Sequence, residues 1–333
     1  MLVLLTGGSG FLGRRIVPKL INEGHSVRVL ARGPLPQLEA IGAQVVISDL
    51  RNWHGLKKAV SGCEAIIHTA GMAGVWGSPT EYLEVNYGGT LNLLDLAKEY
   101  KVRYFVYTSS PSVIYGGKDV RGVDETAPYA ARLKDIYPYS KMLAEKKVLK
   151  SNSSNFKTIA LRPHIIWGPG DPHFLPRLYK SARAGKLKLF TGGPYIFDGI
   201  YVENAADAHV HALKKLMDIR SNVDGQAFFI AQNEPIDINI FVNKLLQCAS
   251  IPQVLPTMSP FWGLTLAHAI EFFWKILQKK SEPPLTVFTV LNLTTSHYYN
   301  LDKTSYLLDY TPGISLKEGL LKLEESLLSS PSS

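Results

Sequence analysis

Two tyrosines and one lysine lie close together in the segment YPYSK, residues 137–141. Residues four positions apart share one face of a helix, whereas residues two apart do not, so Tyr137 rather than Tyr139 can meet Lys141. A free phenol has a pKa of about 10, and a neighbouring cation favours the phenolate and lowers that pKa. The spacing therefore predicts Tyr137 as a proton donor or acceptor that works near neutral pH, with Lys141 as its cationic partner.

A cluster of hydroxyl side chains ends the predicted strand in YFVYTSSPSV, residues 104–113. Ligands of open α/β sheets bind at the carboxyl ends of the strands. A hydroxyl from Thr108, Ser109, Ser110 or Ser112 could therefore reach the same substrate oxygen as Tyr137. The Tyr-x-x-x-Lys spacing is weak evidence by itself, but it gains weight beside this cluster and a glycine-rich turn.

That turn is TGGSGFLG, which places Gly7, Gly10 and Gly13 between a predicted strand and a predicted helix. Glycines in this context permit a tight turn and a close backbone approach, and the helix N-terminus offers N–H groups to a pyrophosphate. The spacing is G-x-x-G-x-x-G rather than the G-x-G-x-x-G of many dinucleotide-binding domains. We predict a dinucleotide site; a turn that binds nothing is the alternative.

Arg32 follows the second predicted strand, in VRVLARG, where an acidic residue would hold the 2′-hydroxyl of NAD. An arginine at this position accommodates the 2′-phosphate, so NADP(H) is favoured and NAD(H) is the alternative. Asp49, in SDL after the third strand, is a candidate for contact with the adenine. It would serve equally well as the N-cap of the next helix.

The elements that must position these residues alternate along the first half of the chain. Apolar, β-branched runs such as LVLLTG and AIIHTAG alternate with amphipathic stretches such as TLNLLDLAKEY. This pattern predicts an α/β fold, a Rossmann-like, doubly wound parallel sheet with a smaller C-terminal substrate-binding region. We expect residues 1–165 to form the dinucleotide-binding domain, with residues 196–232 returning to it. Residues 166–195 and 233–329 would form the substrate-binding region.

Composition narrows the class of protein. The chain has 333 residues, of which 46% are hydrophobic and 19% charged, with a net charge of +8. It lacks the long Lys/Arg blocks of nucleic-acid-binding tails, so no nucleic-acid partner is expected. Cys63 and Cys248 stand apart from each other and from any His/Cys cluster. We therefore expect no metal site and a reducing, cytoplasmic location.

Residues 259–277, SPFWGLTLAHAIEFFWKIL, are apolar almost all round. This segment predicts either a buried or lid helix, or an interfacial helix that touches a membrane. It is slightly short for a membrane span and carries charged residues.

The chain resembles an extended short-chain dehydrogenase/reductase in the motifs TGGSGFLG, SDL, HTAG, NYGGT, YTSSPSVIYGG, YPYSK, LRPHIIWGPGDP and YVENAADAH. More narrowly, it resembles the 3β-hydroxysteroid dehydrogenase family with its sterol-4α-carboxylate 3-dehydrogenases, and also the bacterial 2-alkyl-3-oxoalkanoate reductases of olefin biosynthesis. The resemblance implies Ser110, Tyr137 and Lys141 as the catalytic set. It implies cofactor contacts from Gly7, Ser9, Gly10, Phe11, Leu12, Gly13, Asp49, Leu50, Thr69, Ala70, Gly71, Pro163 and Ile166, a sheet-stabilising role for Asn86, and a homodimer.

These features together predict hydride transfer between a nicotinamide cofactor and a small-molecule substrate. That substrate would be a bulky apolar secondary alcohol or ketone, either sterol-like or a 2-alkyl-3-oxoalkanoate. A nucleotide-sugar epimerase of the same extended family is one alternative, and a non-catalytic dinucleotide-binding scaffold is another. The chain keeps both Tyr137 and Lys141, which non-catalytic scaffolds commonly lose, and this favours an enzyme.

Overall fold

The computed structural model describes residues 1–74, 76–131, 135–279 and 281–329. Its centre is a seven-stranded sheet in which neighbouring strands run parallel. The strands, in spatial order, are β12 (Gln226–Ile230), β7 (Lys157–Pro163), β5 (Tyr104–Thr108), β4 (Ala65–His68), β1 (Leu2–Thr6), β2 (Ser26–Ala31) and β3 (Gln44–Ile47). The predicted Rossmann-like, doubly wound sheet is confirmed.

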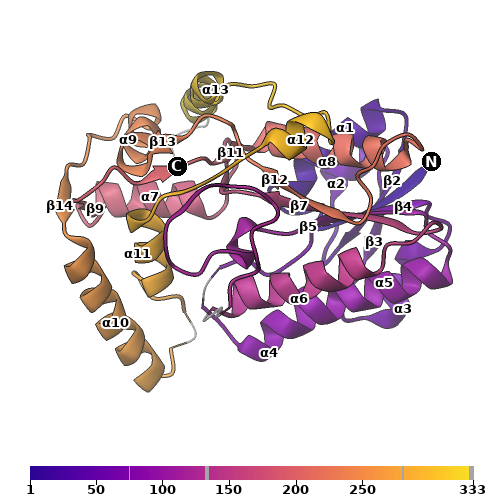
Figure 1. The fold of residues 1–333 in the computed structure, drawn as a ribbon, viewed down its shortest axis with the longest axis horizontal. Helices are drawn as coiled ribbons and strands as arrows, with labels where there is room; N and C mark the ends of the chain where they lie inside the picture. The colour runs from indigo at the N-terminus through magenta and orange to yellow at the C-terminus, as the bar shows by residue number, and fades with distance from the viewer. Residues whose placement is uncertain (75, 132–134, 280, 330–333) are drawn as a thin grey trace.

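Apolar residues fill both faces of this sheet because successive side chains of a strand point to opposite sides. Val3 and Leu5 of β1 face a core shared with α1 (Gly13–Asn22) and α8 (Val202–Met217). Leu4 faces the opposite core, which holds α3 (Trp53–Val60), α5 (Gly89–Glu99) and α6 (Ile136–Lys150). Figure 1 shows α3, α5 and α6 along one side of the sheet. The carboxyl ends of β1, β4 and β5 therefore open between two helical layers.

Shorter elements connect these layers: α2 (Pro36–Glu39), α4 (Pro79–Tyr82), the π-helical turn η1 (Leu83–Gly88) and the 3-10 turn η2 (Pro111–Val113). The turn η1 joins α4 to α5 without a break, so residues 79–99 form one helical rod. Its wider turn lies beside α6, next to the strand ends.

Most of the C-terminal region lies beyond the carboxyl ends of the strands, to the left in Figure 1, but its helix α12 (Asp302–Tyr306) lies against the edge strand β12. The other helices of the region are α7 (Phe174–Arg183), α9 (Ile238–Cys248), α10 (Pro260–Ile276), α11 (Val287–Thr294) and α13 (Leu316–Ser329). Two-stranded pairs are formed by β8 (Ile166–Trp167) with β11 (Ile200–Tyr201) and by β9 (Leu189–Phe190) with β14 (Pro256–Met258).

A four-stranded sheet joins the two halves: β13 (Ile236–Asp237), β10 (Ile196–Phe197), β15 (His297–Tyr299) and β6 (Val120–Val123). It takes β6 from the segment predicted to belong wholly to the dinucleotide-binding domain. It also takes β10 from residues 196–232, whose later part supplies α8 and β12 to the main sheet. The chain therefore crosses between the halves several times.

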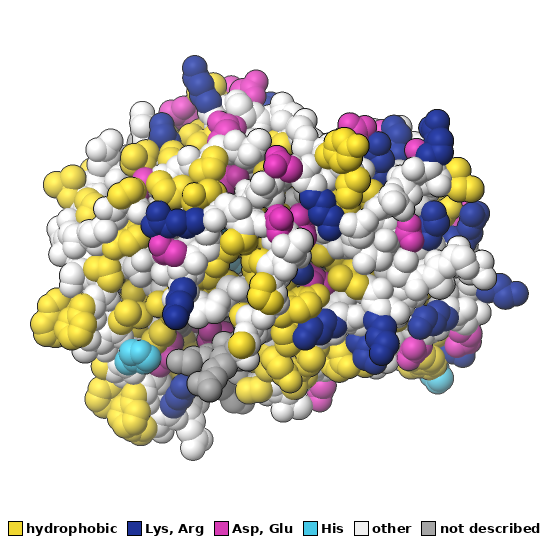
Figure 2. Space-filling model, viewed as in Figure 1, with side chains coloured by type: hydrophobic (Ala, Val, Ile, Leu, Met, Phe, Trp, Pro, Cys, Tyr) yellow, Lys and Arg dark blue, Asp and Glu magenta, His cyan; other side chains and the backbone are white. Residues whose placement is uncertain are grey.

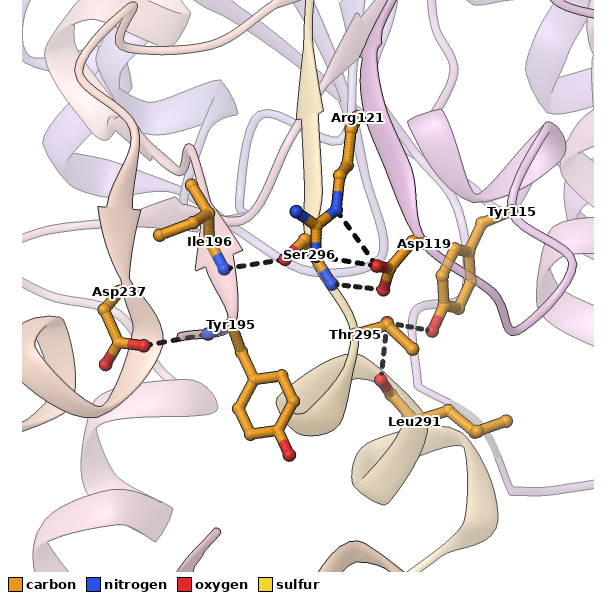
Figure 3. A network of polar contacts seen from close by, with 9 residues as sticks. All are labelled: Tyr115, Asp119, Arg121, Tyr195, Ile196, Asp237, Leu291, Thr295 and Ser296. Carbon is orange, nitrogen blue, oxygen red and sulfur yellow. Dashed lines mark hydrogen bonds and ion pairs between the residues drawn. The ribbon is translucent and has the colours of Figure 1, made fainter. Parts of the chain in front are cut away.

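Polar contacts fasten this small sheet to the loop that follows β5 (Figure 3). Asp119 accepts a hydrogen bond from the backbone N–H of Ser296 at 2.9 Å, and Ser296 Oγ accepts one from Ile196 N at 3.0 Å. The hydroxyls of Tyr115 and Thr295 are 2.7 Å apart. The C-terminal region is thereby held against the segment that carries the serine cluster.

The apolar segment at residues 259–277 forms α10. One side of this helix packs against the protein and the other is exposed to solvent. Figure 2 shows hydrophobic side chains gathered at the lower left of the molecule, where Figure 1 places α10. Gly263 and Ala267 are its buried residues, while most of its aromatic side chains reach the surface. The interpretation of this segment as a buried helix is therefore wrong. Within the described part of the chain, no helix is long and apolar enough to cross a lipid bilayer.

Candidate active site

Tyr137 lies in the first turn of α6, at the carboxyl end of the sheet. Its side chain is half-buried, whereas Tyr139 is 40% exposed. The hydroxyl of Ser110 lies beside the Tyr137 phenol, near enough to lower the pKa of that phenol. The structure thus brings two of the three predicted catalytic residues side by side and turns Tyr139 towards solvent.

Ser110 comes two residues after the end of β5 and directly before η2. Its backbone is extended, and its Oγ accepts hydrogen bonds from Ser112 N at 3.2 Å and from Ser112 Oγ at 2.9 Å. These two bonds fix the hydroxyl as the chain leaves the strand. Ser112 therefore positions Ser110, a role that sequence reasoning did not assign to it.

Lys141 lies one helical turn beyond Tyr137 and is buried. Its Nζ donates to the carbonyl oxygen of Thr108 at 2.5 Å and lies 4.3 Å from the centre of the Tyr107 ring. Burial lowers the pKa of Lys141 to about 7, and the negative charge of Glu145 opposes this shift. Lys141 therefore changes between its charged and neutral forms near neutral pH.

Burial raises the pKa of the Tyr137 phenol, while the neighbouring Ser110 hydroxyl acts in the opposite direction. In the protein alone, removing the phenol from water disfavours the phenolate, so Tyr137 is a proton donor at neutral pH. A positive charge brought beside it would favour the phenolate. The predicted lowering relied on Lys141 together with the positively charged nicotinamide, and it stays a prediction.

The glycine-rich turn packs closely against the segment after β4 at the start of α1. Gly7 has φ +78°, and a Cβ there would lie 2.7 Å from Thr69 Oγ1 and from Ala70 N. A Cβ on Gly13 would lie 2.2 Å from the Gly7 carbonyl oxygen. The other residues of the predicted turn are Ser9 and Gly10, which are exposed, Phe11, which is half-buried, and Leu12, which is buried. This cradle of backbone at a helix N-terminus fits a dinucleotide pyrophosphate.

Two arginines and one carboxylate meet after β2 and β3. Asp49 accepts hydrogen bonds from Arg51 Nε at 2.8 Å and Nη2 at 3.2 Å, and Arg51 with Arg32 lowers the pKa of Asp49. The N-cap of α3 is Asn52, whose Oδ1 accepts from Gly55 N at 3.1 Å, so the interpretation of Asp49 as that cap is wrong. Arg32 itself is exposed. Sequence reasoning did not single out Arg51.

The segment after β4 lines the same space as Lys141. Thr69 Oγ1 donates to the carbonyl oxygen of Thr6 at 2.8 Å, and Ala70 N donates to the Thr6 hydroxyl at 3.3 Å. A Cβ on Gly71 would lie 3.1 Å from Asn86 Oδ1 and 4.0 Å from Lys141 Nζ. Because Gly71 has no side chain, its backbone can lie this close to Asn86 and Lys141.

Asn86, in the π-helical turn η1, ties this segment to α6. Its amide exchanges two hydrogen bonds with the backbone of Met72, at 2.6 and 3.0 Å, and donates to Ser140 Oγ at 3.0 Å. Ser140 Oγ in turn donates to the carbonyl oxygen of Tyr137 at 2.8 Å. Asn86 therefore acts on the loop and on the start of α6 rather than at the centre of the sheet.

Three other predicted cofactor residues lie around this edge. Leu50 is buried in the core below α5, against Gly89. Pro163 ends β7 and pairs with Ile230 of β12, and Ile166 is half-buried in β8. They border the strand ends through apolar surface, and their contacts with a cofactor stay predictions.

Buried histidines near the site are held by protein groups. His68 lies between the hydroxyls of Thr6, at 2.6 Å, and Thr90, at 2.9 Å, and His164 lies 3.0 Å from His297. Among the described residues, no group of three or more His, Cys, Asp or Glu side chains is arranged to hold a metal ion.

Comparisons with known proteins identify relatives of the chain. A model of the 3-beta hydroxysteroid dehydrogenase/isomerase family matches residues 4–257. A 2-alkyl-3-oxoalkanoate reductase of Shewanella oneidensis is 38% identical over 97% of this chain and 85% of its own length. A decarboxylating sterol-4-alpha-carboxylate 3-dehydrogenase of Candida albicans is 35% identical over 96% of this chain and 95% of its own.

A solved structure shares the fold: the UDP-glucose 4-epimerase of Thermus thermophilus in complex with NAD. It has a TM-score of 0.73 and 23% identity, and the match covers 99% of this chain and 100% of that one.

Proposed function

Because the chain belongs to the 3-beta hydroxysteroid dehydrogenase/isomerase family and is an NAD(P)-dependent oxidoreductase, we propose that it transfers hydride between nicotinamide and a bulky apolar secondary alcohol or ketone. The observation that carries the proposal is that Ser110, two residues after the end of β5, lies beside Tyr137 in the first turn of α6. Lys141 lies one turn further along α6, and the glycine-rich cradle lies at the same edge of the sheet.

When bound, the nicotinamide supplies or accepts the hydride. In the reducing direction, Tyr137 donates its proton to the substrate oxygen as negative charge develops there, which its raised pKa permits. Ser110 donates a hydrogen bond to the same oxygen, held in place by Ser112. Lys141, fixed by the carbonyl of Thr108, would hold the nicotinamide ribose and favour the tyrosinate that remains.

The cofactor proposed is NADP(H). Arg32 stands after β2, where an acidic residue would select NAD, and Arg51 lies within hydrogen-bond distance of Asp49 close by. Two guanidinium groups at this edge suit a 2′-phosphate, which arginine binds with two parallel hydrogen bonds. The 2′-hydroxyl of NAD would gain less from them.

Apolar side chains of α11 cover the loop that follows Ser110, and they support an apolar substrate. The rings of Tyr115 and Phe288 meet edge to face with their centres 6.5 Å apart, and a Cβ on Gly117 would lie 3.1 Å from Leu291 of α11. The helix α11, VFTVLNLT, thus presents apolar side chains over the loop that follows Ser110. The names of the Shewanella and Candida relatives point to a 2-alkyl-3-oxoalkanoate or a sterol.

The test is turnover of a long-chain 2-alkyl-3-oxoalkanoate with NADPH, followed by loss of NADPH absorbance, with a 3β-hydroxysterol and NADP⁺ as the second substrate pair. Tyr137→Phe should lower kcat by at least about 10²-fold, because one positioned proton donor is lost, and leave NADPH affinity nearly unchanged. Tyr139→Phe is the matched control and should keep full activity.

A Tyr137→Phe variant that retains most of its turnover would refute the catalytic assignment. Turnover of UDP-glucose in place of both apolar substrates would instead favour the epimerase.

A further inference from the structure

A chain of buried hydrogen bonds runs beneath the candidate active site. It begins at the backbone of Ala70, in the segment that lies against the glycine-rich turn. Thr6 Oγ1, at the end of β1, lies 3.3 Å from Ala70 N and 2.6 Å from Nδ1 of His68, at the end of β4. The side chains of Thr6 and His68 are both buried. The ring of His68 is therefore joined to the backbone on the cofactor side of the site.

The second ring nitrogen of His68 continues the chain towards α6. Nε2 lies 2.9 Å from the hydroxyl of Thr90 in α5, and that hydroxyl donates to the carbonyl oxygen of Asn86 at 2.6 Å. The side chain of Asn86 donates to Ser140, which in turn donates to the carbonyl oxygen of Tyr137. The imidazole of His68 thus stands between the cofactor side of the site and the backbone of the residue that carries the phenol.

The partners of these atoms fix the direction of each hydrogen bond. The carbonyl oxygen of Asn86 can only accept, so the proton of the Thr90 hydroxyl points towards it. Thr90 Oγ1 therefore accepts from His68 Nε2, which must carry a proton. A neutral imidazole has one N–H. Nδ1 is then an acceptor, and the Thr6 hydroxyl donates to it.

Burial favours the neutral ring that this arrangement needs. Removal of the His68 ring from water lowers its pKa to about 3, and the charge of Lys141 acts in the same direction. In an imidazolium both nitrogens would donate, and the Thr6 hydroxyl would lose Nδ1 as its acceptor. Hydrogen bonding and charge therefore agree on one form of the ring, with its proton on Nε2.

We propose that His68, protonated at Nε2 alone, is a positioning residue for hydride transfer, which joins the cofactor side of the site to the start of the catalytic helix. On the cofactor side, Thr6 accepts from Thr69 Oγ1 and Ala70 N, the two atoms that lie 2.7 Å from the place of a Cβ on Gly7. The effect on hydride transfer rests on the proposed function, whereas the form of the ring is a property of the folded protein alone.

Thr90→Val removes the acceptor of His68 Nε2 and keeps the branched shape of the side chain. A buried N–H without an acceptor is costly, so the ring should move its proton to Nδ1 and donate to Thr6. The order of the chain between Ala70 and His68 would then be lost. Thr90→Ser keeps the hydroxyl and should keep the wild-type form of the ring.

The first experiment is long-range hydrogen–nitrogen correlation NMR of the full-length protein with nitrogen-15-labelled histidine, which distinguishes protonated from unprotonated ring nitrogens. The signal of His68 is the one that His68→Gln removes. At neutral pH, the wild-type protein and Thr90→Ser should show a proton on Nε2 and none on Nδ1. Thr90→Val should show the proton on Nδ1.

The second experiment compares NADPH titration and ketone turnover between two valine variants. Thr90→Val should bind NADPH about tenfold more weakly and lower kcat by about tenfold or more, with the KM of the ketone nearly unchanged. Thr158→Val is the matched control, because the Thr158 hydroxyl is equally buried and donates to the carbonyl oxygen of Val148 at 3.0 Å, at the end of β7 opposite to the site. Both variants should melt at a lower temperature than wild type, and Thr158→Val should keep its NADPH affinity and kcat.

A wild-type His68 that carries its proton on Nδ1, or a proton on each nitrogen, would overturn the proposal. A folded Thr90→Val variant with the NADPH affinity and kcat of Thr158→Val would do the same. If Thr90→Val does not fold, the ring form of the wild-type protein decides. If the wild-type protein turned over neither apolar substrate, the proposed function would be refuted, and the role of His68 would be decided by the ring form and the NADPH affinities.

Discussion

Arg162 and Glu145 form a buried ion pair behind the catalytic helix. Arg162 Nη2 lies 2.6 Å from Glu145 Oε1 and Nε lies 3.0 Å from Oε2, and both side chains are almost completely buried. Tyr129 donates its hydroxyl to Glu145 Oε1 at 2.7 Å. Glu145 is one helical turn after Lys141 and two after Tyr137, so α6 carries its reactive and supporting groups on one face.

Glu145→Gln should destabilise the protein by about 3–5 kcal/mol, because the change leaves the Arg162 guanidinium as an uncompensated buried charge. Urea unfolding at neutral pH measures this loss. Glu99→Gln is the control, since Glu99 pairs with Lys57 at 3.0 Å on the exposed surface, and its unfolding midpoint should barely move. Equal midpoints for the two variants would contradict the account of the buried pair.

The kcat/KM of ketone reduction should be highest below pH 7 and should decline as the pH rises through about 7. Lys141 has its pKa lowered to about 7, so it is charged below that pH and neutral above it, and kcat/KM reports the groups of the free enzyme. Glu145→Gln removes a charge that favours the ammonium form and should move the decline to lower pH. An unshifted profile in this variant would exclude Lys141 as the group that titrates.

Arg32→Ala should weaken NADPH binding by about tenfold or more, because a hydrogen bond between charged groups is lost. NADH binding should remain as in the wild-type protein, which makes it the internal control. Fluorescence titration with the two nucleotides side by side gives both affinities. Tighter binding of NADH than of NADPH by the wild-type protein would contradict the role of Arg32 in binding the 2′-phosphate.

Gly13→Ala should abolish dinucleotide binding and lower stability by about 1–3 kcal/mol through overpacking, since its new methyl group would meet the Gly7 carbonyl oxygen at 2.2 Å. Gly33→Ala is the matched control, because the space around Gly33 is open to 4 Å, and it should bind nucleotide normally. Nucleotide titration and thermal melting test the pair. A Gly13→Ala variant that binds like wild type would mean that the turn is looser than the structure shows.

The free energy of unfolding should decrease as the pH falls from about 6.5 to 5. Burial lowers the pKa of His68 and His164 to about 3 and that of His209 to about 4. Below the ordinary value of 6.5 the unfolded chain therefore binds protons that the folded chain does not, at up to about 1.4 kcal/mol per pH unit for each histidine. Urea midpoints across this range measure the slope.

His209→Gln should make that slope shallower, whereas His54→Gln, at an exposed side chain, should leave it unchanged. A wild-type midpoint that is constant between pH 6.5 and 5 would contradict the prediction.

The sequence predicted the main sheet and the choice between two tyrosines because both follow from local rules. Apolar runs that alternate with amphipathic stretches are typical of a parallel sheet, and the four-residue spacing picks Tyr137 over Tyr139. The same spacing extends from Lys141 to Glu145, so Glu145 could have been found. Its partner Arg162 lies on the next strand, and their pairing depends on how α6 packs against β7.

Other features depended on tertiary structure alone. The direction of the Tyr137 pKa shift depends on burial, which no spacing in YPYSK reveals. Asp49 and Asn52 are both good N-cap residues, and only the position at which α3 begins decides between them. The apolar composition of residues 259–277 is compatible with a buried helix, and the packing of Gly263 and Ala267 shows which side faces out.

The four-stranded sheet sets an order for how the molecule forms. Its strand β15 lies between β10 and β6 and pairs with β6 across about 175 residues of chain. The loop after Ser110 therefore cannot gain its final support until residue 299 has been synthesised. Pairing of segments so distant in sequence is slow, because the entropy of closing the intervening chain must be lost first. On the ribosome, the dinucleotide-binding half should therefore become compact well before the enzyme acquires a working site.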